Sequence, residues 1–124
     1  MAVEFQTLGK PDAAFAGLET FPAPRGIGLV RLESDEVAAV CPVTAQPDWY
    51  RVQISYVPRE RCVESKSLKL YLQSFRNEGI FCESFAVRIA DDLAEALGCP
   101  VDVTVIQKAR GGITIEASAR RGEE

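Results

Sequence analysis

The residues best suited to do chemistry are a cysteine and an aspartate seven positions apart, Cys41 and Asp48. The segment that joins them, Cys41-Pro-Val-Thr-Ala-Gln-Pro-Asp48, contains two prolines, which stiffen the loop and hold the thiol in place. A thiolate attacks an electrophilic carbon, and a carboxylic acid nearby can donate the proton that the resulting anion needs. The alternative is structural, because most buried cysteines are inert packing residues and an aspartate often caps a turn.

A second stretch, Glu64-Ser-Lys-Ser-Leu-Lys-Leu-Tyr71, opens a predicted helix and carries two basic side chains. The first amides of a helix point outward and can hold a phosphate, and Lys66 and Lys69 would add positive charge there. The alternative is a solvated helix start in which Glu64 is favourable against the helix dipole. Farther along, Glu83 is either a surface charge or a buried acceptor, because a carboxylate can accept two N–H bonds from the edge of a guanine-like ring.

The composition excludes several kinds of chemistry. The 124 residues include no histidine, so Ser-His-Asp and Cys-His arrangements and histidine-ligated metals are ruled out. Acid–base work then falls to carboxylates, thiols, Lys, Tyr or water. The four cysteines, at positions 41, 62, 82 and 99, form no C-x-x-C pair, so we expect free thiols rather than a zinc site. Neither a Rossmann nor a P-loop glycine motif is present.

Charge and hydropathy limit the partners and the compartment. A net charge of -4 argues against general affinity for nucleic acid or anionic membranes, which select for clustered Lys and Arg. The longest uncharged apolar run, 37–43, is too short to span a bilayer. The N-terminus lacks the basic start and apolar stretch of a secretory signal, so we expect a cytoplasmic protein.

The elements that position these residues follow from hydrophobic periodicity. Prolines and glycines with weak periodicity over 1–26 predict an irregular arm. Alternating or β-branched stretches predict four strands, and spacing of apolar residues at i, i+3, i+4 and i+7 predicts two helices between them. The predicted strands are 28–33, 50–58, 101–107 and 113–117, with turns at 59–62 and 110–112; the predicted helices are 64–77, ended by Gly79, and a second one capped by Ser84 and ended by Gly98.

This order predicts a single α+β domain over 1–124, in which two helices cover one face of an antiparallel sheet. The other sheet face also needs cover, and association of subunits is one way to supply it. Small domains bury a smaller share of their surface and often gain stability in this way.

Several motifs together resemble those of the NADPH-dependent 7-cyano-7-deazaguanine reductases, the QueF family, in its short single-domain form. The resemblance runs from about residue 20 to residue 118. It implies the tunnelling fold (T-fold), whose subunits assemble into β-barrels in ring-like homo-oligomers with active sites at subunit interfaces. The stretches that carry it are Cys41–Asp48, Glu64–Tyr71, Gln73-Ser-Phe-Arg-Asn77, Phe81-x-Glu83 and Arg110-Gly-Gly-Ile113.

The resemblance also implies a mechanism. Cys41 would add to the nitrile and form a covalent thioimide, and Asp48 would be the acid that protonates nitrogen. Two hydrides from two NADPH molecules would then yield 7-aminomethyl-7-deazaguanine, a step of queuosine biosynthesis. The substrate-binding residues that it implies are Glu83, Glu64, Ser65 and Cys82, and the residues implied for the phosphates of NADPH are Lys66, Ser67, Lys69, Arg110 and Gly111.

Two positions depart from the family pattern. Cys82 stands where the family has a histidine, and Ala45 stands where glycine is common. A thiol cannot act as an imidazolium at neutral pH, so Cys82 has three readings: a tolerated change, changed chemistry at the thioimide, or retained binding with impaired turnover. A thiol near Cys41 could also form a disulfide under oxidation.

Two other functions compete with the reductase. One is a related transferase that forms the thioimide and passes it to an amine or ammonia. The other is a deazapurine-binding domain without turnover. Retention of Glu64–Tyr71, the stretch implied for NADPH, favours the reductase over the transferase. Retention of both Cys41 and Asp48 argues against binding alone, which needs neither residue.

Overall fold

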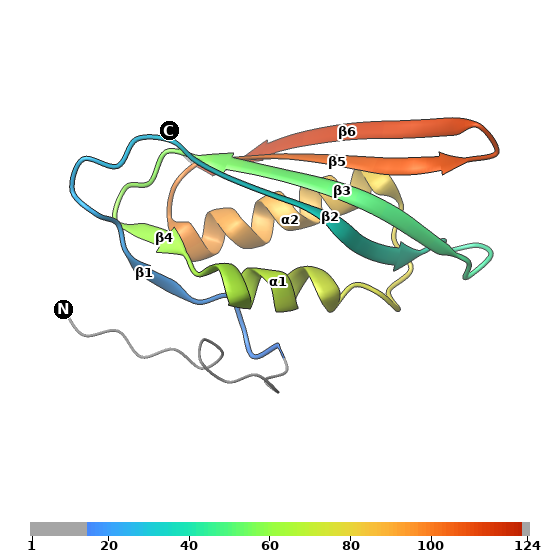
Figure 1. Cartoon of the computed structure of the whole chain (residues 1–124), viewed down its shortest axis with the longest axis horizontal. Coiled ribbons are helices and arrows are strands. Elements are labelled where there is room, and N and C mark those ends of the chain that lie inside the picture. Colours follow the sequence, from blue (N-terminus) through green and yellow to red (C-terminus); the bar gives the residue numbers. More distant parts are fainter. Residues whose placement is uncertain (1–14, 123–124) are drawn as a thin grey trace.

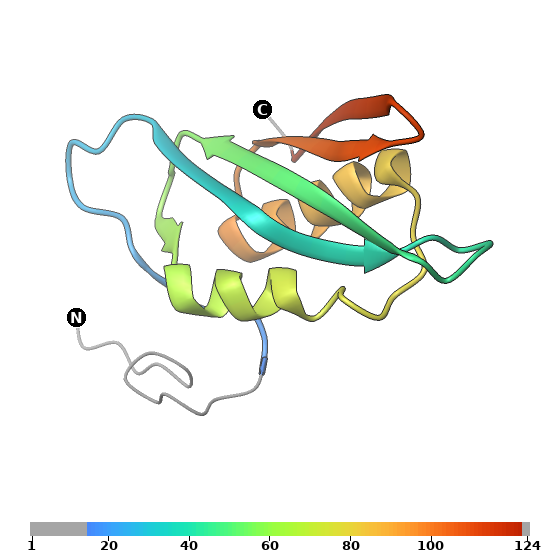
Figure 2. The ribbon, with the colours of Figure 1, turned by 45° about the vertical axis from the view of Figure 1, so that its right-hand side comes forward.

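The computed structural model describes residues 15–122, which form a four-stranded antiparallel sheet with both helices on one face (Figures 1 and 2). The strand order is β2-β3-β5-β6, and a separate antiparallel pair, β1 with β4, leads into α1. This arrangement confirms the predicted α+β class. The elements are β1 (Thr20–Pro22), β2 (Val30–Val40), β3 (Pro47–Tyr56), β4 (Arg61–Val63), α1 (Ser65–Gln73), α2 (Cys82–Leu97), β5 (Val101–Arg110) and β6 (Ile113–Arg121).

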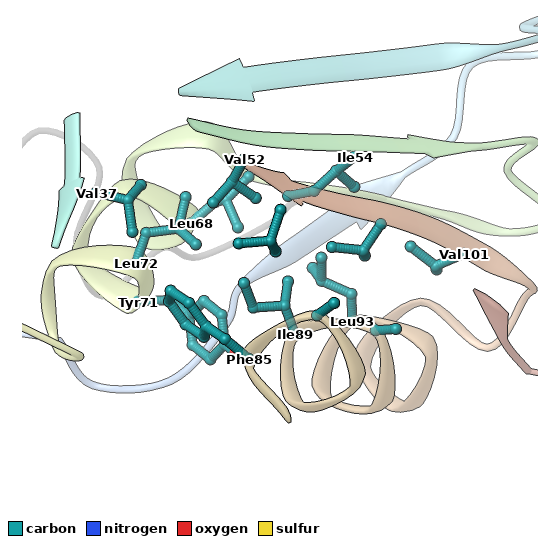
Figure 3. Close-up of a cluster of buried hydrophobic side chains, with 14 of the residues drawn as sticks. Val37, Val52, Ile54, Leu68, Tyr71, Leu72, Phe85, Ile89, Leu93 and Val101 are labelled. Atoms are coloured by element: carbon teal, nitrogen blue, oxygen red, sulfur yellow. The ribbon is translucent and has the colours of Figure 1, made fainter. Parts of the chain in front are cut away.

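The core lies between the sheet and the two helices (Figure 3). Alternate residues of the strands point to it, because successive side chains of a strand face opposite sides. Each helix contributes one apolar stripe at the spacing that the sequence predicts. The largest fully buried side chains are Tyr50, Phe75, Phe85, Ile89, Leu93, Leu97, Val37, Val52, Val101, Val103 and Val105.

The second face of the sheet, which was expected to need cover, carries ion pairs together with the exposed Trp49. Arg51 forms an ion pair with Glu33 across β3 and β2, and Arg120 Nη1 lies 2.6 Å from Asp102 Oδ2 across β6 and β5. Exposed pairs of this kind contribute little to stability but suit water. The ion-paired part of this face therefore does not itself require an apolar partner.

The amino-terminal part of the chain departs from two expectations. Thr20–Pro22 form β1 within the predicted irregular arm, and β4, Arg61–Val63, overlaps the predicted turn 59–62 and continues one residue beyond it. The two strands pair with each other, Phe21 opposite Cys62. Each is only three residues long, so neither carries a periodic signal of its own. Residues 1–14 of the predicted arm lie outside the described residues.

The element boundaries differ at several other points. β2 extends through Val40 because a bulge between Ser34 and Val37 restores the pairing with β3. α1 ends at Gln73 rather than near Gly79, and α2 begins at Cys82 with no side-chain cap, so the predicted cap at Ser84 is wrong. The predicted exit of α2 is confirmed, since Gly98 adopts φ 66° there. Neither helix of the described part is long and apolar enough to cross a bilayer.

Candidate active site

Three segments meet at one end of the sheet: the β2–β3 turn with Cys41, the β5–β6 turn after Arg110, and the start of α2 (Figure 1). The antiparallel order brings both hairpin turns to this end, and the register sets Tyr50 opposite Gln107. Residues that are far apart in sequence therefore lie together here.

The backbone on both sides of Cys41 is held by hydrogen bonds. The Val40 amide donates to the Glu78 carbonyl at 3.0 Å, and the Ile80 amide donates to the Val40 carbonyl at 3.1 Å. After the thiol, the Cys41 amide donates to the Gln46 carbonyl at 2.8 Å. The connection before α2 and the end of the loop thus fix the position of Cys41, as the two prolines of its loop led us to expect.

The Cys41 thiol is activated by its own turn. Its pKa is lowered from 9.0 to about 7, chiefly by a hydrogen bond from the Thr44 side chain, then by the amides of Thr44 and Val43 and by the charge of Arg110. The side chain is half-buried, so it remains open to a substrate. Near neutral pH a large share of the sulfur is thiolate, without any histidine.

Asp48 is held by Arg110 from the neighbouring strand. The carboxylate is only 6% exposed, and its Oδ1 accepts a hydrogen bond from Nη1 of Arg110 in an ion pair. The second arm of the guanidinium, Nη2, donates to Oε1 of Gln46 at 3.2 Å. The ion pair raises the pKa of Arg110, and contact with Cys41 adds to this shift.

Tyr50 lies beneath this group and was not predicted as a site residue. Its side chain is fully buried and its hydroxyl donates to Oε1 of Gln107 at 3.2 Å. The pKa of Tyr50 is raised, first by burial and then by the charges of Asp48, Cys41 and Glu83 among others. Tyr50 therefore supplies a neutral hydroxyl close to all three of them. Its alternation in β3 had marked it only as a core residue.

Cys82 faces the core and not the open site. It is 1% exposed, and its Sγ lies 3.6 Å from the Val105 carbonyl oxygen and 3.8 Å from that of Ile115. Burial raises its pKa, so it is a protonated thiol. The contact with the substrate implied for Cys82 stays a prediction, which its burial does not favour. Glu83, the next residue of the helix, is exposed.

The start of α1 is capped by its own sequence. Both carboxylate oxygens of buried Glu64 accept backbone amides at 2.7 Å, one from Lys66 and one from Ser67. The Ser67 hydroxyl donates to the Glu64 carbonyl and accepts the Glu19 amide, each at 2.9 Å. The Lys66 and Ser67 amides are therefore occupied by Glu64, which caps the helix and is buried rather than solvated as the structural alternative expected.

The remaining predicted residues lie in two places. Ser65 and Lys69 line a groove of about 250 Å³ between α1 and β2. Lys66 follows Ser65 in the first turn of α1. Figures 1 and 2 show that this end of α1 lies toward β4, away from the β2–β3 turn that carries Cys41. Gly111 is exposed in the β5–β6 turn at φ 59°. Within the described part of the chain, no cluster of acidic, cysteine or histidine side chains could hold a metal.

The chain has the T-fold and belongs to the QueF-like family. The family model described as "QueF-like protein" matches residues 47–124, which confirms the resemblance seen in the sequence. An NADPH-dependent 7-cyano-7-deazaguanine reductase of Frankia casuarinae is 49% identical over 90% of this chain and 91% of its own. One from Anaeromyxobacter sp. (strain K) is 50% identical over 91% and 95%. The solved structure of an apo archaeosine synthase QueF-Like matches with a TM-score of 0.74, 28% identity and coverage of 81% and 99%.

Proposed function

We propose that this protein reduces the nitrile of 7-cyano-7-deazaguanine to the aminomethyl group with NADPH. The observation that carries the proposal is the activated Cys41 thiol, in the turn that leads into the strand with Asp48, in a chain without histidine. The names of relatives that are 49–50% identical over nine tenths of the chain support the substrate and the reductant.

In the first step, the Cys41 sulfur bonds to the nitrile carbon and one π pair of the C≡N bond moves to nitrogen. Asp48, which is paired with Arg110, takes the proton that leaves the sulfur as the thiolate forms and delivers it to that nitrogen, so the S–H bond breaks, the N–H bond forms and no net charge changes. Asp48 then acts as a base before it acts as the predicted acid.

Glu83 would orient the ring. An exposed carboxylate in the first turn of α2 can accept the two N–H groups on the guanine-like edge of the substrate. The buried Cys82 would support this by packing, and would not touch the substrate. This arrangement agrees best with the reading in which cysteine at this position is tolerated.

When bound, NADPH would supply the hydride for each of the two reductions. Lys66, Lys69 and Arg110 are the basic residues that we assign to its phosphates, with Ser65 near Lys69 in the groove beside α1. The fit within one chain is incomplete, because about 250 Å³ is below the roughly 300–1,000 Å³ of typical ligand pockets. The capped amides of α1 also leave the lysines as the main donors there.

A second copy of the chain would complete the site. The catalytic turn and the start of α1 lie apart in one chain, so a neighbouring subunit must bring one to the other. Large apolar side chains at Val43, Trp49, Phe81 and Ile113 are exposed around the catalytic turn, as an interface requires. We therefore propose a homo-oligomer with shared sites, working in the cytoplasm, without nucleic-acid or membrane partners.

A transferase is the second candidate, because the archaeosine synthase structure shares the fold. The two are separated by measuring NADPH oxidation with 7-cyano-7-deazaguanine, against release of an amidine product when ammonia or an amine replaces NADPH. The reductase consumes two NADPH per aminomethyl product, and Cys41→Ala abolishes this whereas Glu95→Gln, on the exposed side of α2, leaves it unchanged. Amidine without NADPH oxidation would establish the transferase instead.

A further inference from the structure

Arg110 lies where it can act on both reacting groups at once. It ends β5, and its guanidinium reaches across the sheet end to β3 and to the loop that follows Cys41. One arm binds the Asp48 carboxylate and the other binds the Gln46 side chain. The backbone carbonyl of the same Gln46 accepts the Cys41 amide at 2.8 Å. A continuous set of hydrogen bonds thus joins the carboxylate, the guanidinium and the backbone of the nucleophile.

We propose that Arg110 is a positioning residue that holds Asp48 and the Cys41 thiolate together in the ligand-free protein. The inference rests on the proposed function, in which these two groups react with the nitrile. The guanidinium is ion-paired with Asp48, and its charge is the one that lowers the pKa of Cys41. Its effect on Cys41 and the reciprocal effect of Cys41 on the pKa of Arg110 agree with this role.

The other charges near the thiol do not replace this cation. Asp48 and Glu83 are acidic, and Glu78, whose carbonyl binds Val40, directs its carboxylate to Arg88 at 3.2 Å. Cys82 is a protonated thiol turned to the sheet. Loss of Arg110 would thus leave a half-buried thiolate among acidic groups, which disfavours the charged form.

The position of Arg110 also allows it to move. Its side chain is 40% exposed, and Gly111 and Gly112 follow it at φ 59° and 81°, a turn without side chains to restrain it. An exposed guanidinium at the edge of such a turn can shift from the carboxylate toward an anionic group of NADPH, which joins this role to the phosphate contact assigned above.

The test measures how the rate of Cys41 alkylation by iodoacetamide depends on pH, with peptide mass spectrometry as readout. We expect Arg110→Gln to move the midpoint upward and to slow alkylation at pH 7 several-fold, and Arg110→Lys to restore much of it. Arg121→Gln is the control, since it removes a similar exposed ion pair, with Asp91 at 2.8 Å, at the other end of β6. An unchanged midpoint in Arg110→Gln would overturn the inference.

A second arm uses 7-cyano-7-deazaguanine without NADPH and follows the adduct by intact mass. Arg110→Gln should form it several-fold more slowly at pH 7 than the native protein and recover in part at higher pH, where the thiolate forms without help. Equal rates at pH 7 would also contradict the role. If the native protein itself forms no adduct while the alkylation midpoints still differ, the proposed function fails and the positioning role of Arg110 stands.

Discussion

Cys82 and Glu83 are neighbours in the first turn of α2, yet one is buried against the sheet and the other is exposed at the site. The Cys82 thiol lies against the carbonyl oxygens of Val105 and Ile115, and the Glu83 side chain points to solvent. Successive residues of a helix are rotated by about 100° about its axis, which separates the two environments. The cysteine at the position where the family has histidine therefore packs against the sheet, while its neighbour faces solvent.

The first prediction concerns which cysteine reacts. Iodoacetamide at neutral pH should modify Cys41 of the folded protein and leave Cys62, Cys82 and Cys99 unmodified, because these three are buried and burial raises the pKa of the last two. Peptide mass spectrometry identifies the labelled thiol, and labelling in denaturant supplies the control in which all four react. Labelling of Cys82 at a rate close to that of Cys41 would contradict its placement.

The second prediction concerns the hydroxyl that activates the nucleophile. Thr44→Val should raise the Cys41 pKa from about 7 toward 9, because the largest stabilising contact of the thiolate is lost. Reductase activity at pH 7 then falls several-fold and the acidic limb of its pH profile moves upward. Thr44→Ser should keep the native profile, and Thr114→Val on the exposed part of β6 is the control. A native profile in Thr44→Val would show that the hydroxyl does not act on the sulfur.

The third prediction tests the contact between Gly79 and the β2–β3 turn that carries Cys41. A Cβ added at Gly79 would meet the Pro42 Cα at 3.3 Å, so the turn must shift by a few tenths of an ångström. Gly79→Ala should lower stability by roughly 1 kcal/mol and slow adduct formation at Cys41 more than tenfold. Gly28→Ala, where nothing lies within 4 Å, should change neither. Native kinetics in Gly79→Ala would mean that the Gly79 contact does not position the nucleophile.

The fourth prediction concerns Ala45, the residue of the β2–β3 turn with φ 59°. A left-handed conformation costs an L-residue about 1–2 kcal/mol, and the greater freedom of glycine in the unfolded chain takes back about 0.4–1 kcal/mol. Ala45→Gly should therefore raise the free energy of unfolding by up to about 1 kcal/mol in urea denaturation. Ala117→Gly in β6 should instead lower it. If Ala45→Gly lowered the free energy of unfolding as much as Ala117→Gly does, the positive φ of Ala45 would not be a source of strain.

The fifth prediction separates structure from ligand binding at α1. Glu64→Ala should lower the free energy of unfolding by about 1–2 kcal/mol, because two amides at 2.7 Å lose their acceptor. Glu95→Ala, an exposed residue of α2, should cost little. If Glu64→Ala left the free energy of unfolding unchanged and raised only the KM for the substrate, Glu64 would bind the ligand directly rather than cap the helix.

The main elements were open to prediction because local periodicity determines them. The alternation from Tyr50 to Tyr56 marks β3, and glycine at Gly98 marks the end of α2. The pairing of β1 with β4 has no periodic signal in the sequence, because each strand is only three residues long. The paired residues Phe21 and Cys62 are also more than forty positions apart in the chain. Long-range pairing of this kind depends on the packed structure rather than on either segment alone.

The candidate site divides in the same way. Cys41 and Asp48 could be found from residue type and spacing within one loop, and Thr44 lay between them as an ordinary turn residue. The partnership of Asp48 with Arg110 depends on the register between β3 and β5, which no local pattern reports. The inward direction of Cys82 depends on the residue at which α2 begins, and the sequence placed that start too late.

The central claim is that Cys41 forms a covalent thioimide with the nitrile. Its most direct test incubates the protein with 7-cyano-7-deazaguanine and reads the intact mass before and after NADPH is added. We expect a mass increase equal to one whole substrate molecule, absent in Cys41→Ala, that disappears with NADPH as the aminomethyl product is released. No mass increase in the native protein, or the same increase in Cys41→Ala, would contradict the claim.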